Sequence, residues 1–202
     1  MVNISKFTQI QTSDVVFTEP KTNRTGGMSI GVTLGDNENI VIQTPKCELP
    51  GGIHTKTLSN GKDVMSVDVA MSGDFMDFMT SLDTFVCKKA HENSKVWFKK
   101  KLTMDEIKAI YKPQILATQD GPVLKAKVTN CSVFDELKHR VPINSVKPHC
   151  VSQCILELTG MYFIAKEFGM TWKVLQMRVY PPKKLSDFAF VDSDQDSDTE
   201  PL

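Results

Sequence analysis

The chain has 202 residues, and its 24 Lys and Arg balance its 24 Asp and Glu, so the formal net charge is zero. This length suits one domain, or one domain with an appendage, and 41% hydrophobic with 24% charged residues excludes a wholly disordered chain. No stretch approaches the roughly 18 apolar residues of a membrane span, and the start, MVNISKFTQI, lacks the layout of a secretion signal. We therefore expect a soluble protein that is neither secreted nor held in a membrane.

The zero net charge hides two unlike parts. Five of the 24 acids lie in the last eleven residues, which contain no base, so 24 bases face 19 acids over residues 1–191 and this part carries +5. The acids of the tail are Asp192, Asp194, Asp196, Asp198 and Glu200. A basic body with an acidic end indicates a polyanionic partner. The tail lacks any apolar anchor, so we expect residues 191–202 to be disordered and residues 1–190 to form one domain.

The five cysteines are odd in number and irregularly spaced, which favours reduced thiols over a disulfide framework. Cys150 and Cys154 follow His149 closely enough to raise the question of zinc. Two thiolates and one imidazole leave a tetrahedral zinc ion short of a ligand. We therefore expect buried thiols, with no metal and no cofactor.

Turn residues and short apolar runs alternate through the first 70 residues. Alternation over residues 29–34 predicts a strand, and a second apolar run at residues 40–42 ends before Pro45. Asn60-Gly61 is typical of a hairpin turn and precedes a strand over residues 64–69.

Two helices are predicted in the middle of the chain. Apolar residues recur at helical spacing from Phe75 to Val86, with Ser72 or Asp74 as the N-cap and an end near Lys88. Thr103 and Glu106 form a capping-box pattern that opens a short helix ending before Pro113.

Strands return after Gly121, first over residues 123–128 and then over most of residues 151–180. We place the tip of the last hairpin at Phe168-Gly169-Met170 and its end at Pro181-Pro182. The chain is therefore expected to be mainly β, with the rhythm of a small barrel and a helical excursion between strands.

No catalytic arrangement stands out. The histidines are scattered, and no serine or cysteine lies in a nucleophile motif. We therefore do not expect an enzyme.

Basic residues interleaved with aromatic ones are the strongest functional signal. One run contains Lys95, Trp97, Phe98, Lys99, Lys100 and Lys101. Lysines neutralise phosphates, while aromatic rings offer flat faces to unpaired bases. The alternative is a solvated lysine-rich connection whose rings turn inward.

A second interleaving lies in the last hairpin, where the candidates are Tyr162, Lys166, Trp172, Lys173 and Arg178. Period-two alternation predicts one face with Trp172, Val174, Gln176, Arg178 and Tyr180, and a core face with Lys173, Leu175, Met177 and Val179. The first face suits single-strand binding. The alternative is that Trp172 closes one end of the barrel.

Several segments together resemble a known family. They are Ile155-Leu156-Glu157-Leu158-Thr159-Gly160-Met161-Tyr162-Phe163, Phe168-Gly169-Met170-Thr171-Trp172-Lys173-Val174-Leu175-Gln176, Tyr180-Pro181-Pro182 and the acidic end. Ile42-Gln43-Thr44-Pro45 and the Trp97 region are also similar. The chain resembles the single-stranded DNA-binding proteins of large nucleocytoplasmic DNA viruses, which are related to a phage type of replication protein.

The resemblance implies an OB-fold barrel that binds single-stranded DNA with little sequence preference in viral DNA replication, recombination or repair. It implies that the acidic tail recruits a replication polymerase or helicase. The charge of the tail opposite a basic body separately predicts that the tail competes for the binding groove. The resemblance also implies that the protein is located in the host cytoplasm, at viral replication sites, or in the nucleus. The phage relatives end in an aromatic residue, whereas this chain ends in Pro201-Leu202.

Other interpretations stay open. One is a structural or scaffolding protein of a virion that does not bind nucleic acid, and another is an RNA-binding barrel. A homodimer also stays open.

Overall fold

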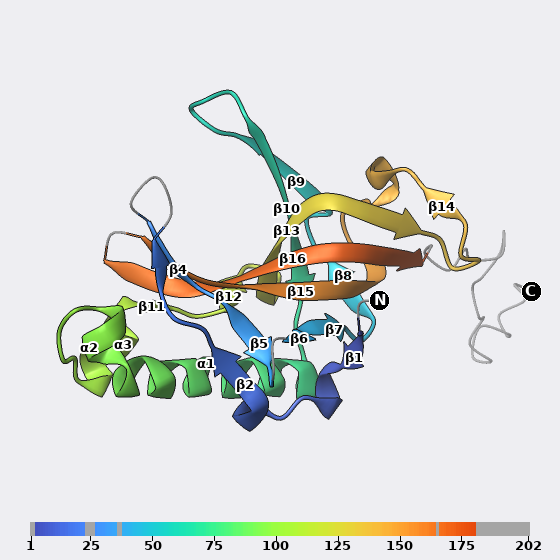
Figure 1. Cartoon of the computed structure of the whole chain (residues 1–202). Helices are drawn as coiled ribbons and strands as arrows, with labels where there is room; N and C mark the ends of the chain where they lie inside the picture. The colour runs from blue at the N-terminus through green and yellow to red at the C-terminus, as the bar shows by residue number, and fades with distance from the viewer. Residues whose placement is uncertain (1–2, 23–26, 36–37, 165, 181–202) are drawn as a thin grey trace, which may run out of the picture.

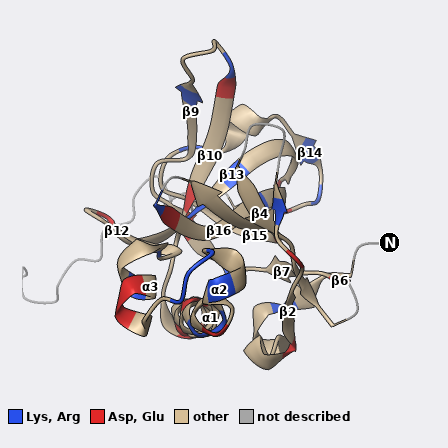
Figure 2. Cartoon of the chain, turned by 60° about the vertical axis from the view of Figure 1, so that its left-hand side comes forward, with Lys and Arg blue, Asp and Glu red and all other residues tan. Residues whose placement is uncertain are grey.

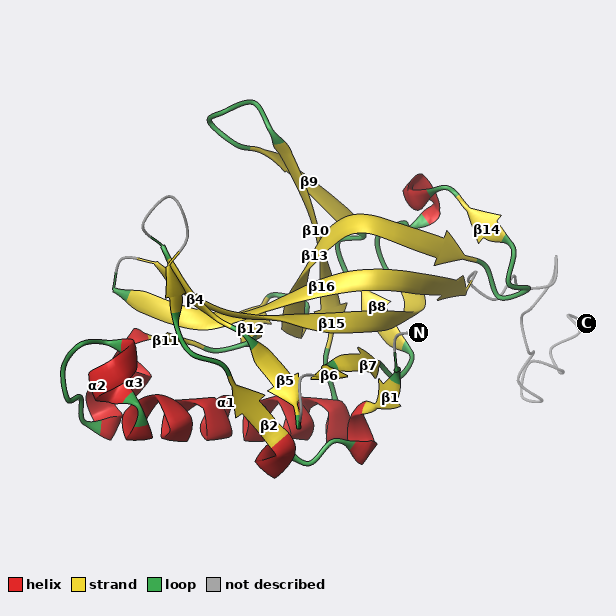
Figure 3. Ribbon diagram, viewed as in Figure 1, coloured by secondary structure: helices red, strands yellow, loops and turns green. Residues whose placement is uncertain are grey.

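Strands dominate the computed structural model, which describes residues 3–22, 27–35, 38–164 and 166–180 (Figures 1 and 3). The strands are β1 (Ser5–Lys6), β2 (Val15–Phe17), β3 (Lys21–Thr22), β4 (Met28–Ile30), β5 (Val32–Leu34), β6 (Glu38–Asn39), β7 (Val41–Gln43), β8 (Cys47–Leu49), β9 (Ile53–Thr57), β10 (Asp63–Ala70), β11 (Tyr111–Lys112), β12 (Ile115–Thr118), β13 (Gly121–Phe134), β14 (Arg140–Val141), β15 (Cys150–Ile164) and β16 (Glu167–Tyr180). The helices are α1 (Gly73–Glu92), α2 (Ser94–Trp97) and α3 (Met104–Ile110), with 3₁₀ turns at Phe7–Gln9, Thr12–Asp14 and Ile143–Ser145.

One large sheet forms most of the fold. Its main path runs β1-β7-β15-β16-β13-β10-β9, and a small second sheet contains β2, β5 and β6. The central strand β16 pairs antiparallel with β15 and parallel with β13. The predicted mainly β class with a helical excursion is confirmed. Among the described strands no pair joins the two ends of the path, so the predicted barrel is not closed.

The long helix α1 lies along one face of the large sheet, between β10 and β13 in the chain (Figure 1). Phe75, Met79, Leu82 and Val86 are buried in the core, as the helical spacing predicts. The helix continues past the predicted end to Glu92, and its last turns bury Ala90 as well. Within the described residues, no helix is both long and apolar enough to cross a membrane.

The predicted capping box is confirmed at the start of α3. The Thr103 hydroxyl oxygen accepts a hydrogen bond from the Glu106 backbone N–H, and the Glu106 carboxylate accepts one from the Thr103 N–H at 2.8 Å. These reciprocal bonds satisfy donors that the first helical turn leaves unpaired.

The predicted turn at Asn60-Gly61 is also confirmed, because it joins β9 to β10. The two strands pair from Asp63 with Thr57 to Val67 with Ile53. Their hairpin projects from the edge of the large sheet (Figure 1), and we call it the arm.

The tip of the last hairpin was predicted wrongly. Ile164 pairs with Glu167, so the chain turns before the predicted tip, and Phe168 and Met170 are buried within β16. Gly169 pairs with Tyr162, and a Cβ atom there would lie 2.8 Å from the Tyr162 hydroxyl oxygen and 3.1 Å from the Lys112 carbonyl oxygen. The glycine is therefore explained by close packing, not by a turn.

A bulge at Leu175 decides which side chains of β16 face the core. Val174 pairs with Leu156 and Gln176 pairs with Ile155, so consecutive residues of β15 oppose residues of β16 that are two apart. Because side chains alternate along a strand, the extra residue exchanges the two faces beyond it.

A network of buried and half-buried polar groups joins α1 to β16. The Asp83 carboxylate accepts hydrogen bonds from the Tyr111 hydroxyl at 2.5 Å and from the Gln114 side-chain amide at 2.6 Å. The Gln114 side-chain oxygen in turn accepts from the Trp172 indole N–H. Burial raises the pKa of Asp83, although these hydrogen bonds oppose the rise.

Replacing Asp83 with Asn is expected to change how stability depends on pH. A carboxyl whose pKa is higher in the folded protein binds more protons there, so its contribution to stability falls as pH rises through the raised pKa. Urea denaturation at several pH values above 4 should show a smaller fall in the free energy of unfolding for Asp83→Asn than for the wild type. Asp77→Asn, at an exposed position of α1, is the control, and equal slopes for all three proteins would contradict this expectation.

Candidate nucleic-acid interface

The two predicted basic and aromatic segments meet in one groove at the end of the last hairpin. This groove, which we call the helix groove, has a volume of about 630 Å³. Trp97, Phe98, Lys99, Lys100 and Lys166 all line it, although more than sixty residues separate the first from the last. Its other lining residues are Met28, Leu102, Glu106, Ala109, Ile110, Phe163 and Glu167. Lys95 and Lys101 are exposed in the same segment but do not line the groove.

Phe98 and Phe163 line the helix groove, and the buried ring of Phe168 packs behind them. The Phe98 ring lies 5.5 Å from that of Phe163 and 5.2 Å from that of Phe168, and the rings of Phe163 and Phe168 stack at 5.6 Å. Trp97 is only 5% exposed and packs against Phe17 at 5.4 Å. The inward-turned alternative therefore holds for Trp97, whereas Phe98 keeps part of its surface accessible.

The predicted faces of β16 are wrong before the bulge at Leu175 and correct for Gln176, Met177 and Arg178 beyond it. Trp172 and Val174 are buried on the core side, and beyond the bulge at Leu175 the buried residue is Met177. Gln176 and Arg178 are exposed. Trp172, which is 1% exposed and donates to Gln114, therefore cannot present a ring face to a base in this structure.

The remaining candidates of the hairpin are separated. Tyr162 is half-buried on the side opposite to the helix groove, since its strand neighbour Phe163 lines that groove. Lys173 forms an ion pair with Glu157 at 2.6 Å. Arg178 lines a different hollow at the far end of β16. The five acidic residues of the tail lie outside the described residues.

The structure reveals a second groove that the sequence analysis missed. It lies between the arm and the last hairpin, has a volume of about 540 Å³, and we call it the arm groove. Its polar lining comprises four lysines and one carboxylate, namely Lys56, Lys112, Lys125, Lys127 and Glu167, with Ser66, Gln114, Tyr162 and Thr171. Apolar surface lies between these groups, and Leu58 and Leu116 are 38% and 40% exposed.

Strand register explains why these lysines gather. One row of paired residues crosses five strands, in the order His54, Ser66, Lys127, Lys173 and Glu157. The adjacent strand residues Val67, Ala126 and Trp172 are buried, so the row lies on the face away from the core. We call this the outer face of the sheet. The alternation of Lys125 and Lys127 with buried Leu124, Ala126 and Val128 was the signal in the sequence.

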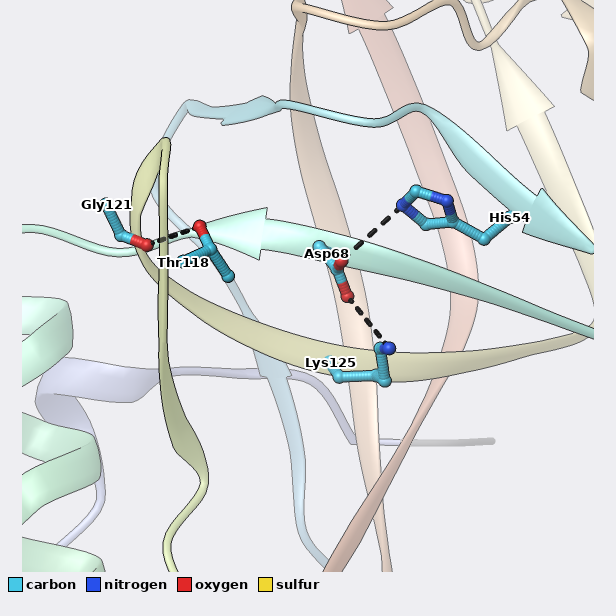
Figure 4. A network of polar contacts seen from close by, with 5 residues as sticks. All are labelled: His54, Asp68, Thr118, Gly121 and Lys125. Atoms are coloured by element: carbon cyan, nitrogen blue, oxygen red, sulfur yellow. Dashed lines mark hydrogen bonds and ion pairs between the residues drawn. The ribbon is translucent and has the colours of Figure 1, made fainter.

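The carboxylates of the outer face are paired with cations. Asp68 lies between His54 at 3.4 Å and Lys125 at 3.8 Å (Figure 4). Glu167 pairs with Lys112 at 2.7 Å, and Glu157 pairs with Lys173.

The lysines that remain are available to an anion. Within the described part of the chain, Lys56 and Lys127 form no ion pair, and both are exposed. Figure 2 shows the lysines of the segment between α2 and α3, Lys99, Lys100 and Lys101, beside the acidic start of α3.

Three of the five predicted buried thiols, Cys47, Cys87 and Cys154, are buried, whereas Cys131 and Cys150 are half-buried. Burial raises the pKa of the Cys154 thiol to about 12 and that of the Cys47 thiol to about 11. Among the described residues, no group of three or more His, Cys, Asp or Glu is arranged to hold a metal ion.

Comparison with solved structures finds low similarity to phage proteins. The single-stranded DNA-binding protein from bacteriophage Enc34 in complex with ssDNA shares 10% identity, with 83% of this chain and 97% of that chain covered and a TM-score of 0.47. Another structure of that protein gives 11% identity, 91% and 99% coverage and a TM-score of 0.42. A C-terminal truncation of that protein shares 10% identity, with 83% of this chain and 96% of that chain covered and a TM-score of 0.43. Scores this low assign neither a fold nor a function to the chain.

Sequence comparison gives a firmer result for the family. No curated protein matches the chain. Residues 58–192, which are more than half of the chain, match a family profile. They include α1, the long strands β10, β13, β15 and β16, and most of both grooves. The chain therefore belongs to a family of unknown function, DUF5871.

Proposed function

We propose that this protein binds single-stranded DNA on the outer face of its large sheet, in the arm groove. The observation that carries the proposal is the set of four lysines over apolar and aromatic surface, where the nearby carboxylates are already paired. Lysines beside a strand's backbone neutralise phosphates and release counterions, and this electrostatic contribution does not depend on sequence.

The strand order supports an OB-fold as part of the proposal. We number β7, β10, β13, β15 and β16 as OB strands 1 to 5. Strand 3 then pairs parallel with strand 5, strand 5 pairs antiparallel with strand 4, and strand 4 pairs antiparallel with strand 1. Strand 2 pairs antiparallel with 3. OB-folds bind oligonucleotides on the face of strands 2 and 3 and with the loop between 4 and 5. The arm groove lies on that face, and the end of the last hairpin borders it.

We assign the base contacts to Tyr162 and to the apolar residues that line the arm groove. Tyr162 lines the arm groove beside Lys112, and burial raises the pKa of its hydroxyl, so the phenol stays neutral at physiological pH. A neutral aromatic ring stacks on a base of any identity, which suits binding with little sequence preference. Leu58 and Leu116 extend the apolar surface that unstacked bases need.

The helix groove is included as a continuation beyond the hairpin end. Glu167 lines both grooves, so a strand that leaves the arm groove can reach Lys99, Lys100 and Lys166. Lys95 and Lys101 add exposed charge in the same segment, and Phe98 offers a partly exposed ring. Trp97 and Trp172 receive no stacking role because both rings are buried.

The wider roles belong to the same proposal and rest on the sequence resemblance. We propose that residues 1–190 form the binding domain of a non-enzymatic viral protein that acts in DNA replication, recombination or repair, in the host cytoplasm or nucleus. The acidic residues from Asp192 to Glu200 would compete for the groove or recruit a polymerase or helicase.

Removing two unpaired lysines is expected to weaken binding. Lys56→Ala with Lys127→Ala should lower the affinity for oligo-dT and should reduce the slope of log affinity against log salt by about one to two, because each phosphate contact contributes about 0.7 for a single strand. Fluorescence anisotropy over a salt series measures both effects. The control is Lys88→Ala on α1, whose lysine is equally exposed but lies away from the outer face. An unchanged slope in the double variant would place the DNA elsewhere.

Replacing the ring of Tyr162 is expected to separate stacking from charge. Tyr162→Leu keeps apolar packing but removes the ring, and the loss of one stacked base, about 1–3 kcal/mol, corresponds to roughly 5- to 150-fold weaker binding. Tyr162→Phe keeps the ring and should bind like the wild type. Salt dependence should stay the same in both variants. Equal affinity of the Leu and Phe variants would exclude stacking at this position.

Deleting residues 192–202 is expected to tighten binding to oligo-dT, because the remaining chain carries +5 and loses an internal anionic competitor. The effect should be largest at low salt, where charges are least screened. A full-length variant with its five acids replaced by Asn or Gln keeps the chain length and should behave like the deletion. Unchanged or weaker binding by both proteins would exclude competition by the tail.

A further inference from the structure

A polar hollow lies on the outer face at the end of the sheet far from the arm groove. It has a volume of about 330 Å³, and its lining combines three side-chain amides, two cations and one aromatic ring. We call it the amide patch, and the residues that define it are Gln43, Gln153, Gln176, Arg178, Phe134 and Lys138. We propose that the amide patch is a second contact surface for the same DNA strand and that it contacts bases. This inference rests on the proposed function.

Strand register builds the patch from two adjacent rows. In the first row, Ile155 on β15 lies between Gln43 on β7 and Gln176 on β16. In the second row, Arg178 lies between Gln153 and Phe134. Side chains directly opposite each other across strands lie close together, so the amides and the guanidinium converge. The bulge at Leu175 is required for this, because it turns Gln176 and Arg178 to the outer face.

Most of the hydrogen-bonding capacity of the patch is unused. Within the described residues, the side chains of Gln43, Gln176 and Arg178 form no hydrogen bond or ion pair with another side chain, and Gln176 and Arg178 are exposed. Gln153 accepts a hydrogen bond from the Tyr180 hydroxyl at 2.6 Å, which fixes its orientation and leaves its two amide hydrogens available. Among the residues that the structure describes, no carboxylate lines the hollow.

These groups match base edges better than phosphates. Glutamine presents a donor beside an acceptor, as base edges do, and arginine donates two parallel hydrogen bonds to paired acceptors. Arginine and glutamine can also donate to phosphate oxygens. A phosphate diester offers only acceptors, however, so it would leave the amide oxygens of the patch unused, whereas a base edge uses both the donor and the acceptor of an amide. Phe134 is half-buried, so part of its ring remains accessible beside them for stacking.

A continuous path connects the patch to the arm groove. Lys127 lines the arm groove, and Lys173 lies opposite it on the neighbouring strand β16. Gln176 and Arg178 follow Lys173 along β16 on the same face. Arg178 is five positions after Lys173, which is about 17 Å along a strand. Lys173 is neutralised by Glu157 between the two sites. One strand several nucleotides long can therefore reach both sites.

The experiment compares short, long and partly abasic oligonucleotides. Wild type, Gln176→Ala and Arg178→Ala are titrated with dT6, with dT20 and with a 20-mer in which half of the nucleotides lack bases but keep their phosphates. Gln11→Ala, an exposed glutamine away from the outer face, is the matched control. Thermal unfolding of each variant confirms that the fold is kept, which is expected because residues 176 and 178 are exposed.

We expect Gln176→Ala to bind dT20 about 2- to 10-fold more weakly with an unchanged salt slope, since a neutral hydrogen bond is lost. Its affinity for dT6, which the arm groove alone accommodates, should not change. The half-abasic 20-mer should bind the wild type more weakly than dT20 does, and Gln176→Ala should cause little further loss. Arg178→Ala should also weaken binding of dT20 selectively.

The opposite results overturn the inference. If Gln176→Ala binds dT20 like the wild type while Lys56→Ala with Lys127→Ala binds weakly, the proposed function stands and the amide patch is excluded as a DNA contact. If Arg178→Ala lowers the salt slope but the abasic half causes no loss, the hollow contacts phosphate and not bases. If the wild type binds no oligonucleotide, both the inference and the proposed function fail.

Discussion

The pairing of β16 with β13 on one side and β15 on the other is the constraint on which the rest of the structure depends. This central strand fixes which residues of three long strands face α1 and which face away from it. Trp172 anchors it to the helix through Gln114 and Asp83, and these buried polar groups are paired with one another. The bulge at Leu175 then assigns Met177 to the core and Arg178 to the outer face.

Pairing among charges determines where the outer face can attract a polyanion. Asp68, Glu157 and Glu167 each contact a lysine, so their charge is offset locally. Lys56 and Lys127 are exposed without such partners among the described residues, and their field is therefore directed to solvent. The formal charge of zero for the whole chain does not reveal this arrangement, because five acids belong to the last eleven residues.

Local features were predicted well because short-range physics sets them. The turn at Asn60-Gly61, the amphipathic stripe of α1 and the capping box at Thr103 each depend on residues within a few positions of one another. The hairpin tip was misplaced because Gly169 was interpreted as a turn residue, whereas its small size serves packing against Tyr162 and Lys112. The faces of β16 were wrong before Leu175 because a single alternation was carried through the bulge, which exchanges the two faces between Val174 and Gln176.

The sequence by itself determined the mainly β class, the central helix, the basic body with its acidic end, and the segments in which lysines and aromatic residues alternate. Only the tertiary structure decided that Trp97 and Trp172 are buried, that Lys166 and Lys99 line one groove, and that lysines from β9, β11 and β13 share another. Composition and periodicity report on neighbours along the chain. Strand register and bulges join residues far apart in sequence, and their energy depends on the packing of the whole sheet.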